Sequence, residues 1–216
     1  SYGEYLVGGF FLGLGGTTFA IGVPFVNSWF PPERRGFAIG IFGIGMGGTA
    51  ISAFSTVQLR DRFGDSVPFD LVAVLLVAYA VVAWLLLVDR PDRVVATGSV
   101  LARTIVTLRM RTTIELAFLY AVAFGGFVAF SVYLPTYLKT AFDLTQSDAA
   151  LRTAGFVVLA VIMRPIGGWL SDRFHPVPVL MVAFAGTAAL ALVAALEAAL
   201  IPVGTVAFLG MAAMLG

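Results

Sequence analysis

Residues 155–170 read GFVVLAVIMRPIGGWL, an apolar run that carries a single charge, Arg164. If the run continues as a helix, its next charge is Asp172, eight residues further on, which is about 12 Å at ~1.5 Å per residue. The hydrocarbon core of a bilayer is only ~30 Å thick, so the guanidinium is predicted to lie near its middle. A charge at that depth costs at least ~2.5–3.5 kcal/mol, and it normally faces the interior of a helix bundle or a water-filled cavity.

Arg164 has two interpretations at this stage. It is either a structural residue, paired with a carboxylate or with helix ends, or an anion-binding residue along a transport path. Gly167 and Gly168 follow at i+3 and i+4, so the helix face of Arg164 also carries the small residues that pack against other helices. We therefore expect Arg164 to face other helices rather than lipid.

The composition is that of a polytopic membrane protein. Of the 216 residues, 60% are hydrophobic and 12% are charged, and the mean hydropathy is +0.99. The absence of cysteine excludes a disulfide framework and a thiolate nucleophile, and the net charge of +1 gives no electrostatic basis for binding nucleic acid. Neither a metal-ligand cluster nor a nucleophile–base pair stands out, so we predict no enzyme and no metal site.

We predict an all-α integral membrane protein with about seven transmembrane segments. Hydropathy places six of them at 5–30, 36–59, 69–88, 114–138, 151–170 and 177–200, with a seventh beginning near Pro202. Because the chain starts without methionine and stops within an apolar run, we expect it to be an internal part of a longer protein. We expect the location to be the cell membrane, crossed several times.

Basic residues give the orientation and one linker. The richer set of loops holds Arg34, Arg35, Arg90, Arg93, Arg103, Arg109, Arg111 and Arg173, and the poorer set holds Arg60, Arg62, Lys139 and Arg152. The richer set is predicted to be cytoplasmic. Residues 89–113 form the longest polar stretch and are predicted to link two helical bundles, at 1–88 and 114–216.

The linker itself has two interpretations. The spacing of Leu101, Ile105 and Leu108 predicts a short amphipathic helix on the cytoplasmic surface, with its arginines available to lipid phosphates. A basic linker that merely follows the topology rule explains the same residues equally well.

Glycines dominate the second segment. Gly36, Gly40, Gly43 and Gly47 form a stripe at i, i+4, i+7 and i+11, and Gly45 and Gly48 add a second one. Glycine within lipid lets helix backbones approach closely. Stripes this dense on two faces also indicate a narrow path or helices that slide against one another.

Aromatic residues supply the other candidate site groups. Tyr120, Phe124 and Phe127 recur at i, i+4 and i+7, a stripe that is either core packing or a ligand contact. A tyrosine hydroxyl within a membrane segment needs a hydrogen-bond partner, which favours the second interpretation somewhat. Glu197 is the one modest candidate for carrying a proton.

Two motifs resemble a known family. The loop GGWLSDRF at 167–174 resembles the G-x-L-x-D-R loop of the major facilitator superfamily, and residues 30–48 resemble the loop that enters its fifth helix. More narrowly, residues 42–48 resemble the A-G-x-G-N-x-G signature of the nitrate/nitrite porters (NarK-like). The glycines at 43, 45 and 48 match, whereas Phe42 and Met46 replace the alanine and the asparagine.

The resemblance implies a secondary transporter of nitrate and/or nitrite that works by alternating access, either as an exchanger or as a proton-coupled importer. It implies no cofactor, a monomer when full length, and a place in the bacterial inner membrane. The chain would correspond to helices four to ten, with a second substrate arginine outside it. The residues matching the family's substrate-binding positions are Phe19, Tyr120, Phe124 and Arg164; the signature helix would hold Gly43, Gly45, Gly47 and Gly48; the conformational loop would hold Gly168, Asp172 and Arg173.

The chemistry of these side chains suits nitrate. A guanidinium offers a planar fork of donors to two oxygens of a planar anion, while the rings of Phe19 and Phe124 would sandwich its plane and the Tyr120 hydroxyl would donate a further bond. Two alternatives remain: a transporter of another small anion or of a drug-like solute, and a membrane sensor or scaffold that transports nothing.

Overall fold

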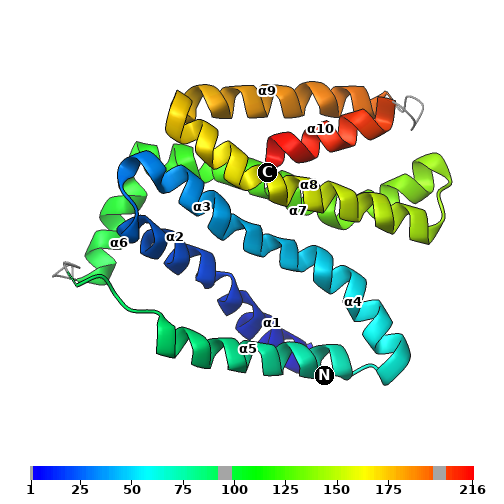
Figure 1. The fold of residues 1–216 in the computed structure, drawn as a ribbon, viewed down its shortest axis with the longest axis horizontal. Coiled ribbons are helices and arrows are strands. Elements are labelled where there is room, and N and C mark those ends of the chain that lie inside the picture. Colours follow the sequence, from blue (N-terminus) through cyan, green and yellow to red (C-terminus); the bar gives the residue numbers. More distant parts are fainter. Residues whose placement is uncertain (1, 92–98, 197–202) are drawn as a thin grey trace.

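The computed structural model describes residues 2–91, 99–196 and 203–216, and within them the chain is helical with no strand (Figure 1). The helices are α1 (Tyr2–Gly15), α2 (Thr17–Trp29), η1 (Pro32–Arg34), α3 (Arg35–Gly43), η2 (Ile44–Gly47), α4 (Gly48–Phe63), α5 (Val67–Leu86), α6 (Val100–Arg109), α7 (Arg111–Phe142), α8 (Gln146–Phe174), α9 (Pro176–Ala195) and α10 (Thr205–Leu215). The predicted all-α class is confirmed.

Five spans in the described part of the chain are long and apolar enough to cross a membrane. They comprise α1 with α2, then α5, α7, α8 and α9, at Tyr2–Trp29, Val67–Leu86, Arg111–Phe142, Gln146–Phe174 and Pro176–Ala195. These match five predicted segments, and α10 is the short apolar helix where the seventh was expected.

The second predicted segment is also helical, but it is interrupted. Residues 35–63 run through α3, the 3₁₀ turn η2 and α4. The turn has the sequence IGMG and is followed directly by Gly48. Glycine is among the weakest helix formers, and a short 3₁₀ stretch within a helix commonly marks a strained or hinge-like site. The glycine signature thus coincides with the break.

The helix connections gather at two ends of the molecule, as the loop charges predicted. In Figure 1 the α2–α3, α6–α7 and α8–α9 connections and the C-terminal end of α5 lie at the left. The α4–α5 and α7–α8 connections and the C-terminal end of α9 lie at the right. The left end is the predicted cytoplasmic end. Arg93, Glu197 and Pro202, which entered the predictions above, lie outside the described residues.

The core lies between α7, α8 and α10. Its fully buried large side chains are Phe127 and Leu138 from α7, Phe156 from α8 and Met211 from α10. Helices α1 and α5 instead keep most apolar side chains exposed, as expected of helices whose neighbours are lipid or further helices.

Helices α3 and α8 make the most extensive contact between any two helices of the described chain. Glycines allow it: a Cβ at Gly36 would lie 2.5 Å from the carbonyl oxygen of Gly168, and one at Gly40 would lie 2.7 Å from Pro165 Cα. Since real Cβ atoms do not approach so closely, the backbones meet only because these positions lack side chains. The crossing joins the two predicted halves and places Arg164 against Gly40 and Gly43 of α3.

Candidate functional site

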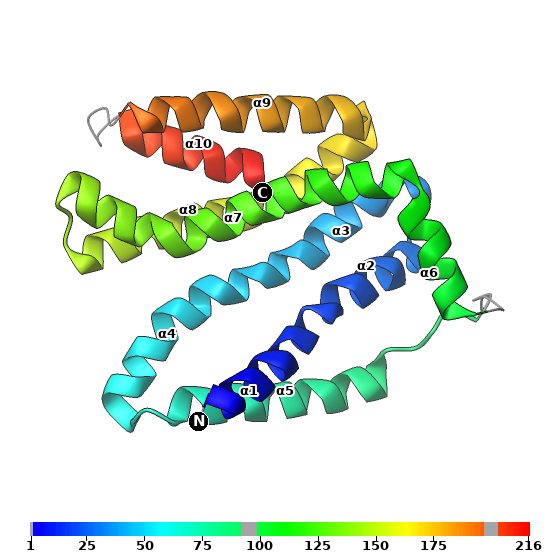
Figure 2. The ribbon, with the colours of Figure 1, turned by 180° about the vertical axis from the view of Figure 1, so that it is seen from behind.

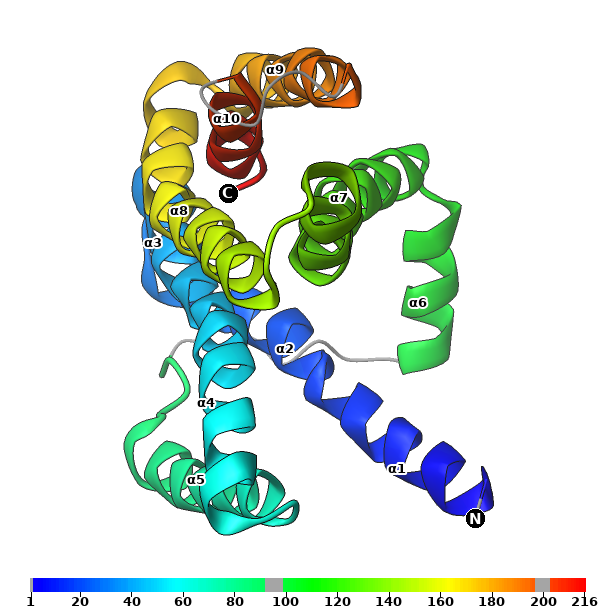
Figure 3. The same cartoon turned by 90° about the vertical axis from the view of Figure 1, so that its right-hand side faces the viewer.

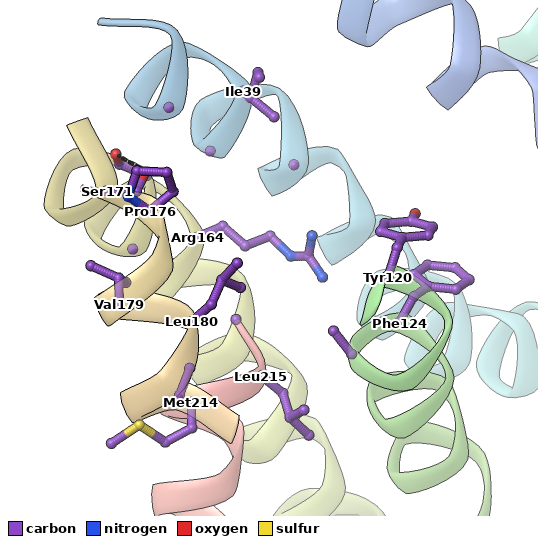
Figure 4. A pocket seen from close by; sticks show the side chains of 18 of the residues that line it. Ile39, Tyr120, Phe124, Arg164, Ser171, Pro176, Val179, Leu180, Met214 and Leu215 are labelled. Atoms are coloured by element: carbon purple, nitrogen blue, oxygen red, sulfur yellow. Dashed lines mark hydrogen bonds between the residues drawn. The ribbon is translucent and has the colours of Figure 1, made fainter. Parts of the chain in front are cut away.

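The four residues predicted to bind substrate line one cavity. Its volume is about 590 Å³, and residues from α2, α3, α7, α8, α9 and α10 contribute to its wall. Phe19 comes from α2, Tyr120 and Phe124 from α7, and Arg164 from α8. In Figure 4 the side chain of Arg164 extends from α8 towards the rings of Tyr120 and Phe124 on α7.

Arg164 contacts an aromatic ring and a glycine, with no carboxylate beside it among the described residues. Its guanidinium carbon lies 5.3 Å from the centroid of the Phe127 ring, an arrangement in which the ring face attracts the cation. On the α3 side, a Cβ at Gly43 would lie 3.0 Å from Arg164 Cδ, so the missing side chain gives the arginine its room.

The donors of Arg164 have no acceptor among the described residues. Its Nε is buried without a hydrogen-bond partner, and it takes no part in the ion pairs that the structure describes, such as Arg60 with Asp61 and Arg111 with Glu115. An unpaired buried donor carries a desolvation cost of about 1–3 kcal/mol, more when it is charged. An anion in the cavity that Arg164 lines would give the guanidinium an acceptor that the described residues do not supply.

The aromatic residues form a stack instead of an open sandwich. The Tyr120 ring stacks on Phe124 with centroids 5.5 Å apart and on Phe19 with centroids 5.8 Å apart. The Tyr120 ring therefore covers part of both phenyl rings that were expected to enclose the anion. The predicted sandwich between Phe19 and Phe124 stays a prediction, and it requires the rings to separate from Tyr120.

The two departures from the glycine signature have structural explanations. The Phe42 ring lies 5.9 Å from that of Phe19 and fills the space beside Gly22, where a Cβ would approach its Cε2 to 2.8 Å. Met46 packs against the core cluster and is not among the residues lining the cavity. Phe42 thus supports a site residue, whereas Met46 has a packing role.

The four signature glycines divide into two pairs. Gly43 faces Arg164, and a Cβ at Gly47 would lie 3.4 Å from Val161 Cγ1, so both contact α8. At Gly45 and Gly48 no described atom lies within 4 Å of a Cβ position. The first predicted stripe therefore forms the helix contact, and the second does not.

The loop residues form a second feature at the predicted cytoplasmic end. Both carboxylate oxygens of Asp172 accept backbone hydrogen bonds at 2.8 Å, one from Gly36 N–H and one from Phe37 N–H. These donors belong to the first turn of α3, where backbone N–H groups lack partners within the helix and a negative charge is favoured. Gly168 contacts Gly36 directly.

Arg173, the third predicted loop residue, lies apart from this cap. It is exposed, and its guanidinium carbon lies 5.9 Å from the Trp169 ring centroid and 5.9 Å from that of Phe174. The structure thus brings Gly168 and Asp172, but not Arg173, against α3.

Several contacts of the site were not assigned from the sequence. The sequence predicts Phe127 as part of the aromatic stripe but does not indicate that Arg164 lies over its ring. Phe127 is three residues from both Phe124 and Phe130, a spacing that fits core packing and a site contact equally well. Residues of α9, including Leu180 and Thr187, also line the cavity. The Thr187 hydroxyl donates to Ala183 O at 2.8 Å, so only its lone pairs remain available.

The comparisons define the class of protein. The chain belongs to the Major Facilitator Superfamily, whose profile matches residues 1–216. Together with the apolar spans, this makes it a multi-pass membrane protein of a transporter family, in accord with the expectation that it is not an enzyme.

More particular likenesses are to nitrate and nitrite transporters. The chain is 49% identical over 197 residues to a probable nitrate/nitrite transporter, NarK2, of Mycobacterium tuberculosis, covering 91% of this chain and 50% of that protein. It is 37% identical to the nitrite extrusion protein of Bacillus subtilis, covering 85% and 46%. A probable nitrate/nitrite antiporter, NarK1, of Thermus thermophilus is 35% identical, with 81% and 42% covered.

These likenesses confirm the predicted resemblance to NarK-like porters. The chain spans about half the length of the curated relatives that it matches. No solved structure gave a significant match.

Proposed function

We propose that the protein is a secondary transporter that carries nitrate and nitrite across the cell membrane, with Arg164 as the anion-binding residue. The single observation that carries the proposal is that Arg164 has no acceptor among the described residues and lines a cavity together with Tyr120, Phe124 and Phe19. The names of the relatives in M. tuberculosis, B. subtilis and T. thermophilus agree with it.

Binding would follow from the geometry of planar groups. The guanidinium presents a fork of donors to two oxygens of a planar anion. The Phe127 ring beneath it is 1% exposed, which keeps water from one side of the cation and strengthens the electrostatic attraction in this low-dielectric setting. The hydroxyl of Tyr120 is the next donor, since that residue shares the cavity wall.

Transport would use two bundles that rock against each other. We propose that residues 1–88 belong to one bundle, 89–113 to the linker and 114–216 to the other. The contact between α3 and α8 supports this division, because it crosses between the halves and rests on glycine backbones and one carboxylate cap. Such a contact interlocks few side chains, so it can form and break when the two bundles move. We propose that Gly36, Gly168 and Asp172 close the predicted cytoplasmic side.

The charge of Arg164 favours exchange over free uptake. Arginine stays protonated throughout the accessible pH range, so a carrier without anion keeps a buried, unpaired cation. That state is penalised during reorientation, whereas a carrier loaded with either anion is not. We therefore propose that nitrate entering on one side is exchanged for nitrite leaving on the other.

Liposome counterflow tests this proposal. The purified protein is reconstituted, nitrite is loaded inside, and uptake of labelled nitrate is followed. Uptake that depends on internal nitrite, and that excess external nitrite but not formate or chloride inhibits, is the expected result. Nitrate uptake driven by a pH gradient without internal nitrite would contradict exchange, and equal inhibition by formate and chloride would contradict the substrate assignment.

A further inference from the structure

Helix α6 differs from every membrane-spanning helix in its direction. It runs across one end of the bundle, at the left in Figure 1 and at the right in Figure 2, whereas α7 runs along the bundle. Figure 3, turned by a quarter, also shows α6 lying across while α7 is seen nearly end-on. If α7 crosses the bilayer, α6 lies along its surface at the predicted cytoplasmic end.

One face of α6 is apolar and uncovered. Leu101, Ile105 and Leu108 fall within about 60° of one another at 100° per residue, on a single face. Their exposed fractions are 70%, 43% and 61%. No residue of α6 is buried. Transfer of three large aliphatic side chains on one helix face from water into an adjacent apolar phase is favourable.

The threonine hydroxyls of α6 have hydrogen-bond partners, whereas its two arginines have no ion-pair partner among the described residues. The hydroxyls of Thr104 and Thr107 donate to the backbone oxygens of Val100 and Arg103, each at 3.0 Å. Arg103 and Arg109 have no ion-pair partner among the described residues, and α6 contains no acidic residue. By helical spacing Arg109 flanks the apolar face, whereas Arg103 lies on the opposite face.

We propose that α6 is an interfacial helix that docks onto the cytoplasmic leaflet, with Leu101, Ile105 and Leu108 inserted at the level of the headgroups and Arg109 bound to the phosphate of an anionic lipid. The occupant of this surface is a lipid because the cytoplasmic leaflet is anionic and attracts basic segments next to membrane-spanning helices. The next helix, α7, begins only two residues after α6 ends, which keeps α6 at the membrane surface.

These 216 residues contain no cysteine, so single labels can be placed on α6 once any cysteine elsewhere in the protein is replaced by serine. Ile105→Cys on the apolar face and Thr107→Cys on the polar face each give one attachment point for a nitroxide label. The protein is reconstituted in vesicles of phosphatidylcholine with phosphatidylglycerol, and collisions with oxygen and with a water-soluble nickel chelate are recorded. The label at Ile105 is expected to collide mainly with oxygen and the label at Thr107 mainly with nickel.

Other outcomes overturn the proposal. Strong nickel collision at both positions means that α6 lies in water. Weak collision with both reagents at Ile105 means that protein, not lipid, covers the apolar face.

The choice of lipid is tested with a matched pair of arginines in the Ile105→Cys background. Arg109→Gln is expected to lower the ratio of docked to undocked helix about fivefold in the phosphatidylglycerol vesicles, from about 1 kcal/mol per basic residue near an anionic surface. It is expected to change little in phosphatidylcholine alone. Arg103→Gln removes the same charge from the far face and is expected to have a smaller effect. Equal effects of the two substitutions, or an equal loss in neutral vesicles, would contradict the binding of Arg109 to an anionic headgroup.

Discussion

The guanidinium of Arg164 lies over the ring of Phe127, with the guanidinium carbon 5.3 Å from the ring centroid. Phe127 is 1% exposed and also stacks on Phe156, whose centroid is 6.5 Å away. The cation is therefore supported by a ring fixed in the core, while its Nε stays unpaired. This support fixes the direction in which the donors point.

Replacing the supporting ring is expected to weaken anion binding. Phe127→Leu keeps an apolar side chain but removes the ring face, a contact worth about 0.5–2 kcal/mol, so the KM for nitrate should rise between twofold and thirtyfold. Phe156→Leu is the matched control, since it shrinks the same buried ring cluster but leaves in place the Phe127 ring over which the guanidinium of Arg164 lies. Similar KM values in the two variants, measured by counterflow, would show that packing alone accounts for the effect.

The crossing of α3 and α8 predicts a sharp difference between two adjacent glycines. A Cβ at Gly168 would lie 2.6 Å from the carbonyl carbon of Gly36, whereas no described atom lies within 4 Å of one at Gly167. Gly168→Ala is expected to destabilise the protein by about 1–3 kcal/mol, the usual cost of overpacking, and Gly167→Ala to leave stability nearly unchanged. Thermal unfolding in detergent measures both, and equal melting temperatures would contradict the close backbone contact.

The carboxylate cap predicts a change in access from the predicted cytoplasmic side. Asp172→Asn removes the negative charge from the first turn of α3, a loss of about 0.5–2 kcal/mol, and the α3–α8 contact should open more often. In a Ser171→Cys background, labelling by a membrane-impermeant thiol reagent should speed up several-fold. Asp143→Asn, at the far end of α7 with a left-handed backbone (φ 51°) that asparagine tolerates, is the control. An unchanged labelling rate at Ser171→Cys would argue against the cap as a closing contact.

The hydroxyl of Tyr120 is expected to contribute separately from its ring. Tyr120→Phe keeps the stacks on Phe19 and Phe124 but removes a donor, and a hydrogen bond to a charged group contributes about 1.5–3 kcal/mol. Nitrate affinity should fall at least tenfold while stability is retained. Tyr120→Leu, which removes the stack as well, should lower both. If Tyr120→Phe binds nitrate normally, the hydroxyl does not contact the anion.

Much of this arrangement could be predicted from residue spacing. Helical periodicity placed Gly36, Gly40, Gly43 and Gly47 on one face, and that face does contact α8. The hydropathy pattern likewise marked the spans, and the spacing of Leu101 and Ile105 marked the helix α6. Each of these features depends on positions within one helix, which the sequence specifies directly.

What could not be predicted depends on contacts between helices. The stacking of Tyr120 on Phe19 is set by how α2 and α7 cross, and the partnership of Phe42 with Gly22 is set by α2 and α3. The 3₁₀ turn at residues 44–47 interrupted a segment that hydropathy treats as continuous, because hydropathy does not register the low helix propensity of glycine.

The central claim is that Arg164 binds the anion, and direct nitrate titration of the purified protein tests it. Arg164→Lys keeps the charge but loses the planar fork, so nitrate affinity should fall about tenfold or more. Arg164→Gln should lose detectable binding. Arg173→Gln, which alters an exposed arginine stacked on Trp169 and Phe174, should bind as the unaltered protein does. Nitrate binding by Arg164→Gln with an unchanged Kd would contradict the account.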